Sequence, residues 1–196
     1  MDTDVPWVTN AADREAHEQR LAAMRGRRLE GVRYVAADEW GLERGAGFDS
    51  ADFGLELDLD DGTTWSFAWL QKGRNEGVLA VPRGLVGGEL RAGGEYEVAD
   101  VSADKDWRPL VGQSIEAVEA AWQRTEWWSG DERGWTDLCV ASWVVHFASD
   151  HVVVTLGRRE EDGRYSWTHE NVAVFFSLAD ARAHGIPLPG DTPAGE

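Results

Sequence analysis

Residues 53–69 read FGLELDLDDGTTWSFAW, and this stretch decides the fold class. Apolar and polar residues alternate on both sides of an Asp-Asp-Gly turn. Such a period of two is typical of half-buried β-strands. The stretch therefore predicts an antiparallel hairpin with strands at 53–59 and 64–69.

The length of the turn sets the register of this hairpin. A three-residue turn at 60–62 pairs Leu57 with Trp65, whereas a two-residue turn would place Trp65 opposite Asp58. We predict the longer turn, because a slip by one residue moves a whole set of side chains to the other face. The predicted apolar face consists of Phe53, Leu55, Leu57, Trp65, Phe67 and Trp69. The opposite face is expected to show Glu56 and Asp58 to solvent.

A weak internal repeat extends this prediction to the whole chain. Residues 24–32 (MRGRRLEGV) and 110–118 (LVGQSIEAV) share Gly, Leu or Ile, Glu and Val at an offset of 86 positions. Further strands are predicted at 28–37, 78–81, 138–147, 151–156 and 164–176, with helices at 10–24 and from Ser177 to Gly185. The expected fold class is mainly β with α (α+β). Two similar antiparallel β-meander halves form one barrel- or sandwich-like domain, with an N-terminal helix and a short C-terminal helix.

The predicted organisation follows the repeat and the glycine-rich stretch between its copies. Residues 38–52 are expected to form a loop within the first copy. The segments are an N-terminal arm and helix at 1–23, a first β repeat at 24–82, a Gly-rich linker at 83–106, a second β repeat with the C-terminal helix at 107–185, and a flexible tail at 186–196.

The composition excludes several classes of protein. The chain has 196 residues with 36 Asp and Glu against 19 Lys and Arg, a net charge of -17, which argues against direct binding of nucleic acid. Its single cysteine rules out a disulfide framework within the chain. A secretory signal and an apolar run of about 20 residues are both missing, so we expect a cytoplasmic protein that does not enter the membrane.

Sequence motifs for catalysis are missing as well. The chain has no phosphate loop, dinucleotide fingerprint, nucleophile elbow or His-Glu-x-x-His motif, so we expect neither an enzyme nor a cofactor. The weak candidates for a metal site are His146, His151 and His169, which could gather at one end of three strands. Histidines at the solvent edge of the strands are the competing interpretation.

Acidic residues are concentrated between Asp38 and Asp61, which hold nine acids and one base. Such a stretch suits a docking surface for a basic protein, because complementary charge speeds association and selects the partner. A solvated face that keeps the protein soluble is the competing interpretation. The candidate partner-binding acids are Asp38, Glu39, Glu56, Asp58, Asp60 and Asp61.

Tryptophans are concentrated between Trp122 and Trp135, a segment predicted to be a loop that holds four of them. One or two should anchor the core. The candidates for partner binding are Trp127, Trp128 and Trp135, because tryptophan buries a large area at low entropic cost.

These features lead to one main hypothesis and two alternatives. The chain is expected to be an acidic protein-interaction protein, most concretely an immunity or antitoxin-type inhibitor that binds a basic toxin or enzyme. One alternative is a small-molecule-binding or enzymatic β-barrel with a pocket lined by Trp and His. The other is a structural subunit of a larger assembly. The oligomeric state stays open.

Overall fold

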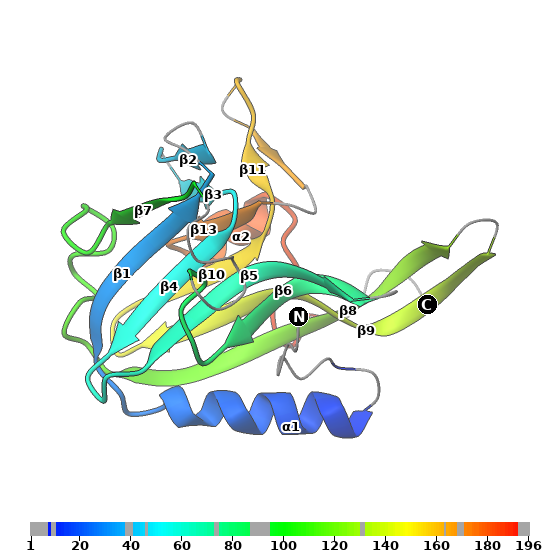
Figure 1. Cartoon of the computed structure of the whole chain (residues 1–196), viewed down its shortest axis with the longest axis horizontal. Helices are drawn as coiled ribbons and strands as arrows, with labels where there is room; N and C mark the ends of the chain where they lie inside the picture. Colours follow the sequence, from blue (N-terminus) through cyan, green and yellow to red (C-terminus); the bar gives the residue numbers. More distant parts are fainter. Residues whose placement is uncertain are drawn as a thin grey trace.

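The fold was analysed in a computed structural model, which describes residues 8, 11–37, 41–45, 47–72, 75–86, 95–129, 132–162, 164–167 and 171–191. Two antiparallel sheets are stacked on each other, and helices pack against them (Figure 1). The predicted fold class, an α+β domain of two similar meanders, is confirmed. The stacked arrangement is sandwich-like.

The first sheet has five strands in the order β6-β5-β4-β1-β7. Its strands are β1 (Leu29–Ala36), β4 (Gly54–Leu59), β5 (Thr64–Lys72), β6 (Asn75–Val81) and β7 (Glu97–Asp100). The β4–β5 hairpin pairs Leu57 with Trp65 and Leu55 with Phe67, which confirms the predicted register. Gly62 lies in its turn with φ +81°, a left-handed conformation that glycine adopts without steric cost.

The prediction for Phe53 is wrong. Strand β4 begins at Gly54, whose φ of +151° breaks the alternation of side chains. Phe53 instead packs with Val35, Leu85 and Tyr96 on the outer face of the first sheet. A Cβ added at Gly54 would lie 2.3 Å from the carbonyl oxygen of Phe67, so the close approach of β5 requires glycine there.

The second sheet has six strands in the order β2-β3-β13-β10-β9-β8. Its strands are β2 (Leu42–Glu43), β3 (Phe48–Ala51), β8 (Ile115–Ser129), β9 (Glu132–Phe147), β10 (His151–Leu156) and β13 (Val172–Phe175).

Two sequence predictions about these strands need correction. The expected loop at 38–52 contains β2 and β3, and β3 pairs with β13 of the other half. The expected strand at 164–176 is two strands, β12 (Tyr165–Ser166) and β13. β12 pairs with β11 (Arg158–Arg159) in a separate ribbon. Short strands of two to four residues carry too little periodicity to be read from sequence.

Helix α1 (Ala11–Leu21) continues into the 3-10 turn η1 (Ala22–Met24) and runs alongside β8 (Figure 1). Helix α2 (Leu178–Ala183) begins where the sequence predicts a helix, and the Ser177 hydroxyl caps it by accepting a hydrogen bond from the Asp180 amide. Neither helix in the described part of the chain is long and apolar enough to span a membrane.

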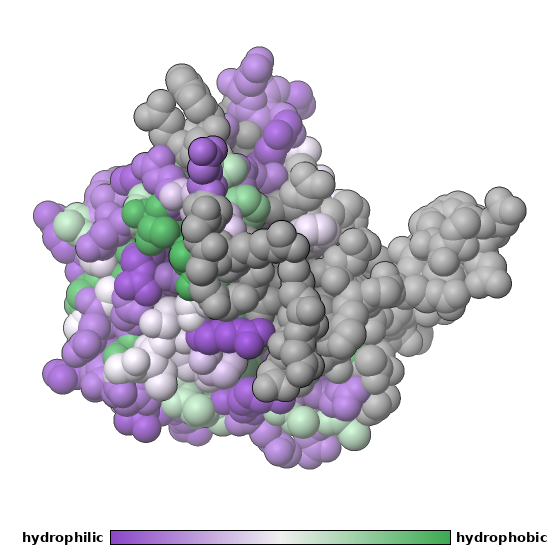
Figure 2. Space-filling model, viewed as in Figure 1, coloured by the Kyte–Doolittle hydropathy of each residue, from purple (hydrophilic) through white to green (hydrophobic). Residues whose placement is uncertain are grey.

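Large side chains from both sheets fill the space between them. The first sheet contributes Tyr34 and Phe67, and the second contributes Trp143 and Phe147. Trp107, in the turn that follows β7, is also fully buried. On the face seen in Figure 2 the described surface is mostly hydrophilic, in keeping with an interior that holds most of the apolar side chains.

Further layers cover the outer faces of both sheets. Helix α2 packs on the second sheet together with Ile186 and Leu188, which are 5% and 3% exposed. The prediction of a flexible tail from 186 onward is therefore wrong for residues 186–191. Burial of each of these two side chains stabilises the folded state by about 1.5–3 kcal/mol, which holds the segment on the sheet. The predicted linker at 83–106 is likewise wrong where β7 pairs with β1 and where Leu85 is buried.

The two repeated segments are hydrogen-bonded to each other across a local two-fold relation. The amide of Gly26 donates to Ile115 O (2.7 Å), and the amide of Gly112 donates to Leu29 O (2.7 Å). Leu29 N donates to Gln113 O (3.0 Å), and its equivalent Ile115 N donates to Arg27 O (2.8 Å). Each copy then leads into a four-stranded meander, β1-β4-β5-β6 in the first sheet and β8-β9-β10-β13 in the second.

Candidate interaction surface

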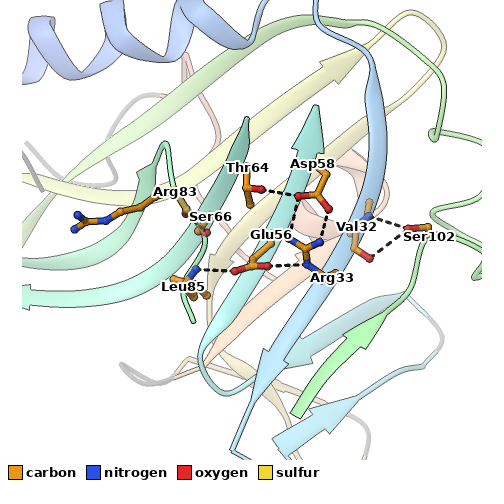
Figure 3. Close-up of polar contacts among 9 residues, drawn as sticks. All are labelled: Val32, Arg33, Glu56, Asp58, Thr64, Ser66, Arg83, Leu85 and Ser102. Carbon is orange, nitrogen blue, oxygen red and sulfur yellow. Dashed lines mark hydrogen bonds and ion pairs between the residues drawn. The ribbon is translucent and has the colours of Figure 1, made fainter. Parts of the chain in front are cut away.

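Glu56 and Asp58 lie on the outer face of β4, and both bind Arg33 of β1 (Figure 3). Arg33 Nε donates to Glu56 Oε2 at 2.8 Å, and the two terminal guanidinium nitrogens donate to Asp58 at 2.5 and 2.9 Å. Two further donors complete the group, the Leu85 amide to Glu56 (2.6 Å) and the Thr64 hydroxyl to Asp58 (2.6 Å). The planar guanidinium suits such bidentate binding.

The strand registers bring these groups together. Arg33 lies opposite Glu56 in the β1–β4 pair, and Thr64 lies opposite Asp58 in the β4–β5 pair. The segment after β6 then covers this face, because Leu85 is 1% exposed and its amide caps Glu56. The expectation that Glu56 faces solvent is therefore wrong: Glu56 is 4% exposed. Asp58 is partly buried and bound to Arg33.

Asp60 and Asp61 lie in the β4–β5 turn and also pair within the chain. Arg28 Nε lies 3.3 Å from Asp60, and Arg27 Nε lies 3.1 Å from Asp61. The hydroxyl and amide of Thr63, together with Arg27, lower the pKa of Asp61. Both carboxylates keep about a quarter of their side-chain surface exposed (24% and 25%), so they stay accessible while their charge is partly balanced.

Most of the acidic stretch is thus bound internally. Asp38 and Glu39 fall outside the described residues. Two more acids accept hydrogen bonds from within the chain, Asp49 from Tyr34 and Asp52 from Asn171. Four further acids, on β4 and in the turn after it, bind arginines: Glu56, Asp58, Asp60 and Asp61. Most described acids between 38 and 61 therefore bind donors of the same chain. The arginines that balance this stretch come mostly from β1 and the turn before it, outside the acidic window.

The segment that holds Trp127, Trp128 and Trp135 is a hairpin of long strands, so the prediction of a loop is wrong. β8 and β9 stay paired along this segment. Trp127 lies opposite Gly134, and Glu126 lies opposite Trp135. β10 pairs with β9 only from Ser142 to His146. Residues 124–129 and 132–138, which we call the arm, extend away from the stacked sheets (Figure 1). The structure describes the backbone at these three tryptophans but not their side chains.

Trp122 lies at the base of the arm, where helix α1 holds it. Its indole Nε1 donates to Glu18 at 2.7 Å, and the guanidinium carbon of Arg14 lies 4.8 Å from the centre of its ring. Arg14 and Glu18 are themselves paired at 3.1 Å. A cation over an indole adds roughly 0.5–1 kcal/mol at an exposed site.

The structure brings two of the three candidate histidines together. His146 and His151 are opposite each other in the β9–β10 pair, with ring centres 4.9 Å apart. His146 Nε2 lies 3.0 Å from Glu119. His169 falls outside the described residues. Among the described residues, no group of three or more His, Cys, Asp or Glu side chains could hold a metal ion.

A buried polar chain between the sheets was not predicted. Trp107 Nε1 donates to the Tyr34 hydroxyl at 2.8 Å, which in turn donates to Asp49 at 2.9 Å. Burial raises the pKa of Asp49 and holds that of Tyr34 well above its usual value. These residues come from three separate segments, so nothing in their spacing indicates that they meet.

Comparison of the chain with protein-family models, with curated proteins and with solved structures gave no match.

Proposed function

We propose that this chain is a non-enzymatic, cytoplasmic interaction protein that docks on a basic partner. In its most concrete form it is an immunity or antitoxin-type inhibitor of a basic toxin or enzyme. The observation that carries the proposal is the arm, a projecting two-stranded hairpin whose sequence holds Trp127, Trp128 and Trp135 among acids. An isolated hairpin is at best marginally stable in water, so a bound partner would stabilise it.

The charge of the arm supports a cationic partner. Residues 124–138 include four acids, Glu126, Asp131, Glu132 and Asp137, against two arginines, Arg124 and Arg133. Tryptophan anchors surrounded by acids suit arginine and lysine, which pair with carboxylates and stack on indole.

The acids of the β4–β5 hairpin take a smaller part in the proposal. Glu56 and Asp58 are withdrawn as docking residues, because Glu56 is buried and both are bound to Arg33. Asp60 and Asp61 remain at an exposed turn and can add long-range attraction. Amide substitutions there should slow association chiefly at low salt, since screening removes such attraction above about 0.1 M.

The test is purification of the tagged protein from its native host with quantitative mass spectrometry. The arm variant carries Trp127→Ser, Trp128→Ser and Trp135→Thr, and the control is Trp167→Ser, at a tryptophan that is 48% exposed outside the arm. We expect one strongly basic protein to be retained by the wild type and the control and lost with the arm variant. Equal retention by all three, or an acidic partner, would contradict the proposal.

An inhibitor also has to relieve the effect of its partner. The gene for the retained protein is expressed alone and together with the wild type or the arm variant. We expect growth to be impaired by the partner alone, restored by the wild type and not by the arm variant. Normal growth with the partner alone would leave a binding protein without an inhibitory role.

A further inference from the structure

Helix α1 buries a histidine that finds no hydrogen bond. His17 is 1% exposed, and neither of its ring nitrogens has a partner in the part of the chain that the structure describes. Its ring centre lies 5.3 Å from that of Trp143 on β9, which is itself fully buried. A buried polar group without a partner costs about 1–3 kcal/mol, so its place in this interface calls for an explanation.

The surroundings of His17 favour its neutral form. Arg20 lies one turn further along the same face of α1, and its terminal nitrogen Nη1 is buried without a partner in the described chain. Burial first and then the charge of Arg20 lower the pKa of His17 to about 4, against a smaller opposing effect of Glu18. From β9 the facing group is the neutral indole of Trp143, and no ionisable group of the described strands acts on the ring.

We propose that His17 is an acid-operated latch that holds α1 on the sheets while neutral and releases the helix when protonated. In the docked helix, no acceptor for a second imidazole proton lies among the described residues. In the released helix, water would hydrate the imidazolium fully. The rest of the attachment would not compensate. Its other fully buried side chains, Leu21 and Met24 of η1, do not titrate, and the Glu18–Trp122 bond is at the surface.

The direction of the pH effect follows from proton linkage. A group that binds its proton more weakly in the docked state stabilises docking above its unperturbed pKa of 6.5, and that stabilisation is lost between pH 6.5 and about 4. With these two values, the equilibrium constant for opening α1 at pH 5 should exceed that at pH 8 about 30-fold. Opening would also free Trp122, at the base of the arm, from Glu18 and Arg14.

Hydrogen–deuterium exchange of the full chain at pH 8 and pH 5, corrected for intrinsic exchange rates, tests the latch. The amides of α1 should open about 30-fold more at pH 5, while those of β10 change far less. His17→Phe and His17→Leu should each abolish the difference in α1, and Arg20→Gln should move its midpoint to higher pH.

NMR titration of the histidine rings gives an independent readout in the wild type. The His17 ring is expected to titrate near pH 4, well below the usual 6.5 of a histidine, and its protonation should coincide with the opening of α1. Titration of His17 near pH 6.5, or an equal pH effect in α1 of the wild type and both His17 variants, would overturn the proposal.

Discussion

Arg33 shows how one residue changes the meaning of a charge pattern. From the sequence it is one of several arginines before the acidic stretch, yet its guanidinium binds both carboxylates expected to face a partner. The excess of acids between 38 and 61 is therefore partly structural. A charge count along the chain cannot separate acids that bind within the fold from acids that face a partner, because cross-strand pairing joins residues 23 and 25 positions apart.

Replacing Arg33 should destabilise the fold strongly. Arg33→Met keeps much of the aliphatic stem but leaves Glu56 buried without its charge partner, so we expect a loss of about 3 kcal/mol in the free energy of unfolding. Arg27→Met, whose pair with Asp61 is exposed, should cost far less. Urea denaturation of both variants measures this, and similar losses would mean that the Arg33 group contributes no more than a surface pair.

The chain of Trp107, Tyr34 and Asp49 gives a second prediction. Tyr34→Phe removes the hydroxyl that both neighbours use and leaves two buried groups without it, which should cost about 2 kcal/mol. Asp49→Asn keeps an acceptor for Tyr34 and should cost less. Chemical denaturation at pH 7 compares the two, and an equal or smaller cost for Tyr34→Phe would show that the hydroxyl is dispensable.

The same aspartate should show a pH effect of defined sign. Because the pKa of Asp49 is raised on folding, its contribution is fully present below the unfolded pKa and is lost as pH rises through the folded pKa. The stability of Asp49→Asn relative to wild type should therefore improve from pH 3 to pH 7 in urea denaturation. A constant difference would contradict the raised pKa.

At the scale of elements, the paired segments at 24–32 and 110–118 organise both meanders. Gly26 and Gly112 have φ of +78° and +88°, and each is followed by a strand with a register shift one residue after Leu29 or Ile115. This equivalence of backbone conformation, hydrogen bonds and strand order matches the internal repeat in the sequence.

Equivalent glycines should respond equally to substitution. No atom lies within 4 Å of a Cβ added at Gly26 or Gly112, so alanine at either position brings only the backbone cost of a left-handed residue, about 1–2 kcal/mol. Gly31→Ala, where the added Cβ makes ordinary contacts, should cost much less. Thermal unfolding measures all three, and clearly unequal losses at Gly26 and Gly112 would argue against equivalent roles.

Strands with a clear alternation of apolar and polar residues were predictable, whereas the short strands and the 15-residue β8 were not. The alternating pattern predicted the β4–β5 pairing of Leu57 with Trp65, and His151–Leu156 was predicted with its true ends. β3 and β7 have four residues each and owe their pairing to strands far along the chain. Phe53 was misplaced because the conformation of Gly54 depends on contact with β5, which local sequence does not reveal.

The candidate site was predicted only in part. Local composition identified the tryptophans and acids. The prediction that Glu56 faces solvent, however, assumed that nothing covers the outer face of its sheet. Leu85 covers that face from a segment predicted to be a linker. His17 carried no sequence signal beyond its place in α1, because its burial depends on Trp143, far along the chain.

At the scale of the molecule, the arm is the part that least depends on the stacked sheets. Among the described residues its backbone pairs are between β8 and β9 alone, while the core is built from other strands of the two stacked sheets together with the proximal ends of these two. An element that adds little to folding yet is rich in tryptophan is expected to be kept for binding.

Shortening the arm tests this separation of stability from binding. We would replace residues 126–135 by Asn-Gly, so that Thr125 and Thr136, which are paired in the structure, flank a two-residue hairpin turn. The melting temperature followed by circular dichroism should change by no more than about 3 °C, since a loss of about 1 kcal/mol shifts it by roughly 2–4 °C in a chain of this size. A variant that melts far earlier or fails to fold would place the arm among the elements that stabilise the body. If the shortened chain folds normally and still retains the basic partner, the binding surface lies on the sheets rather than on the arm.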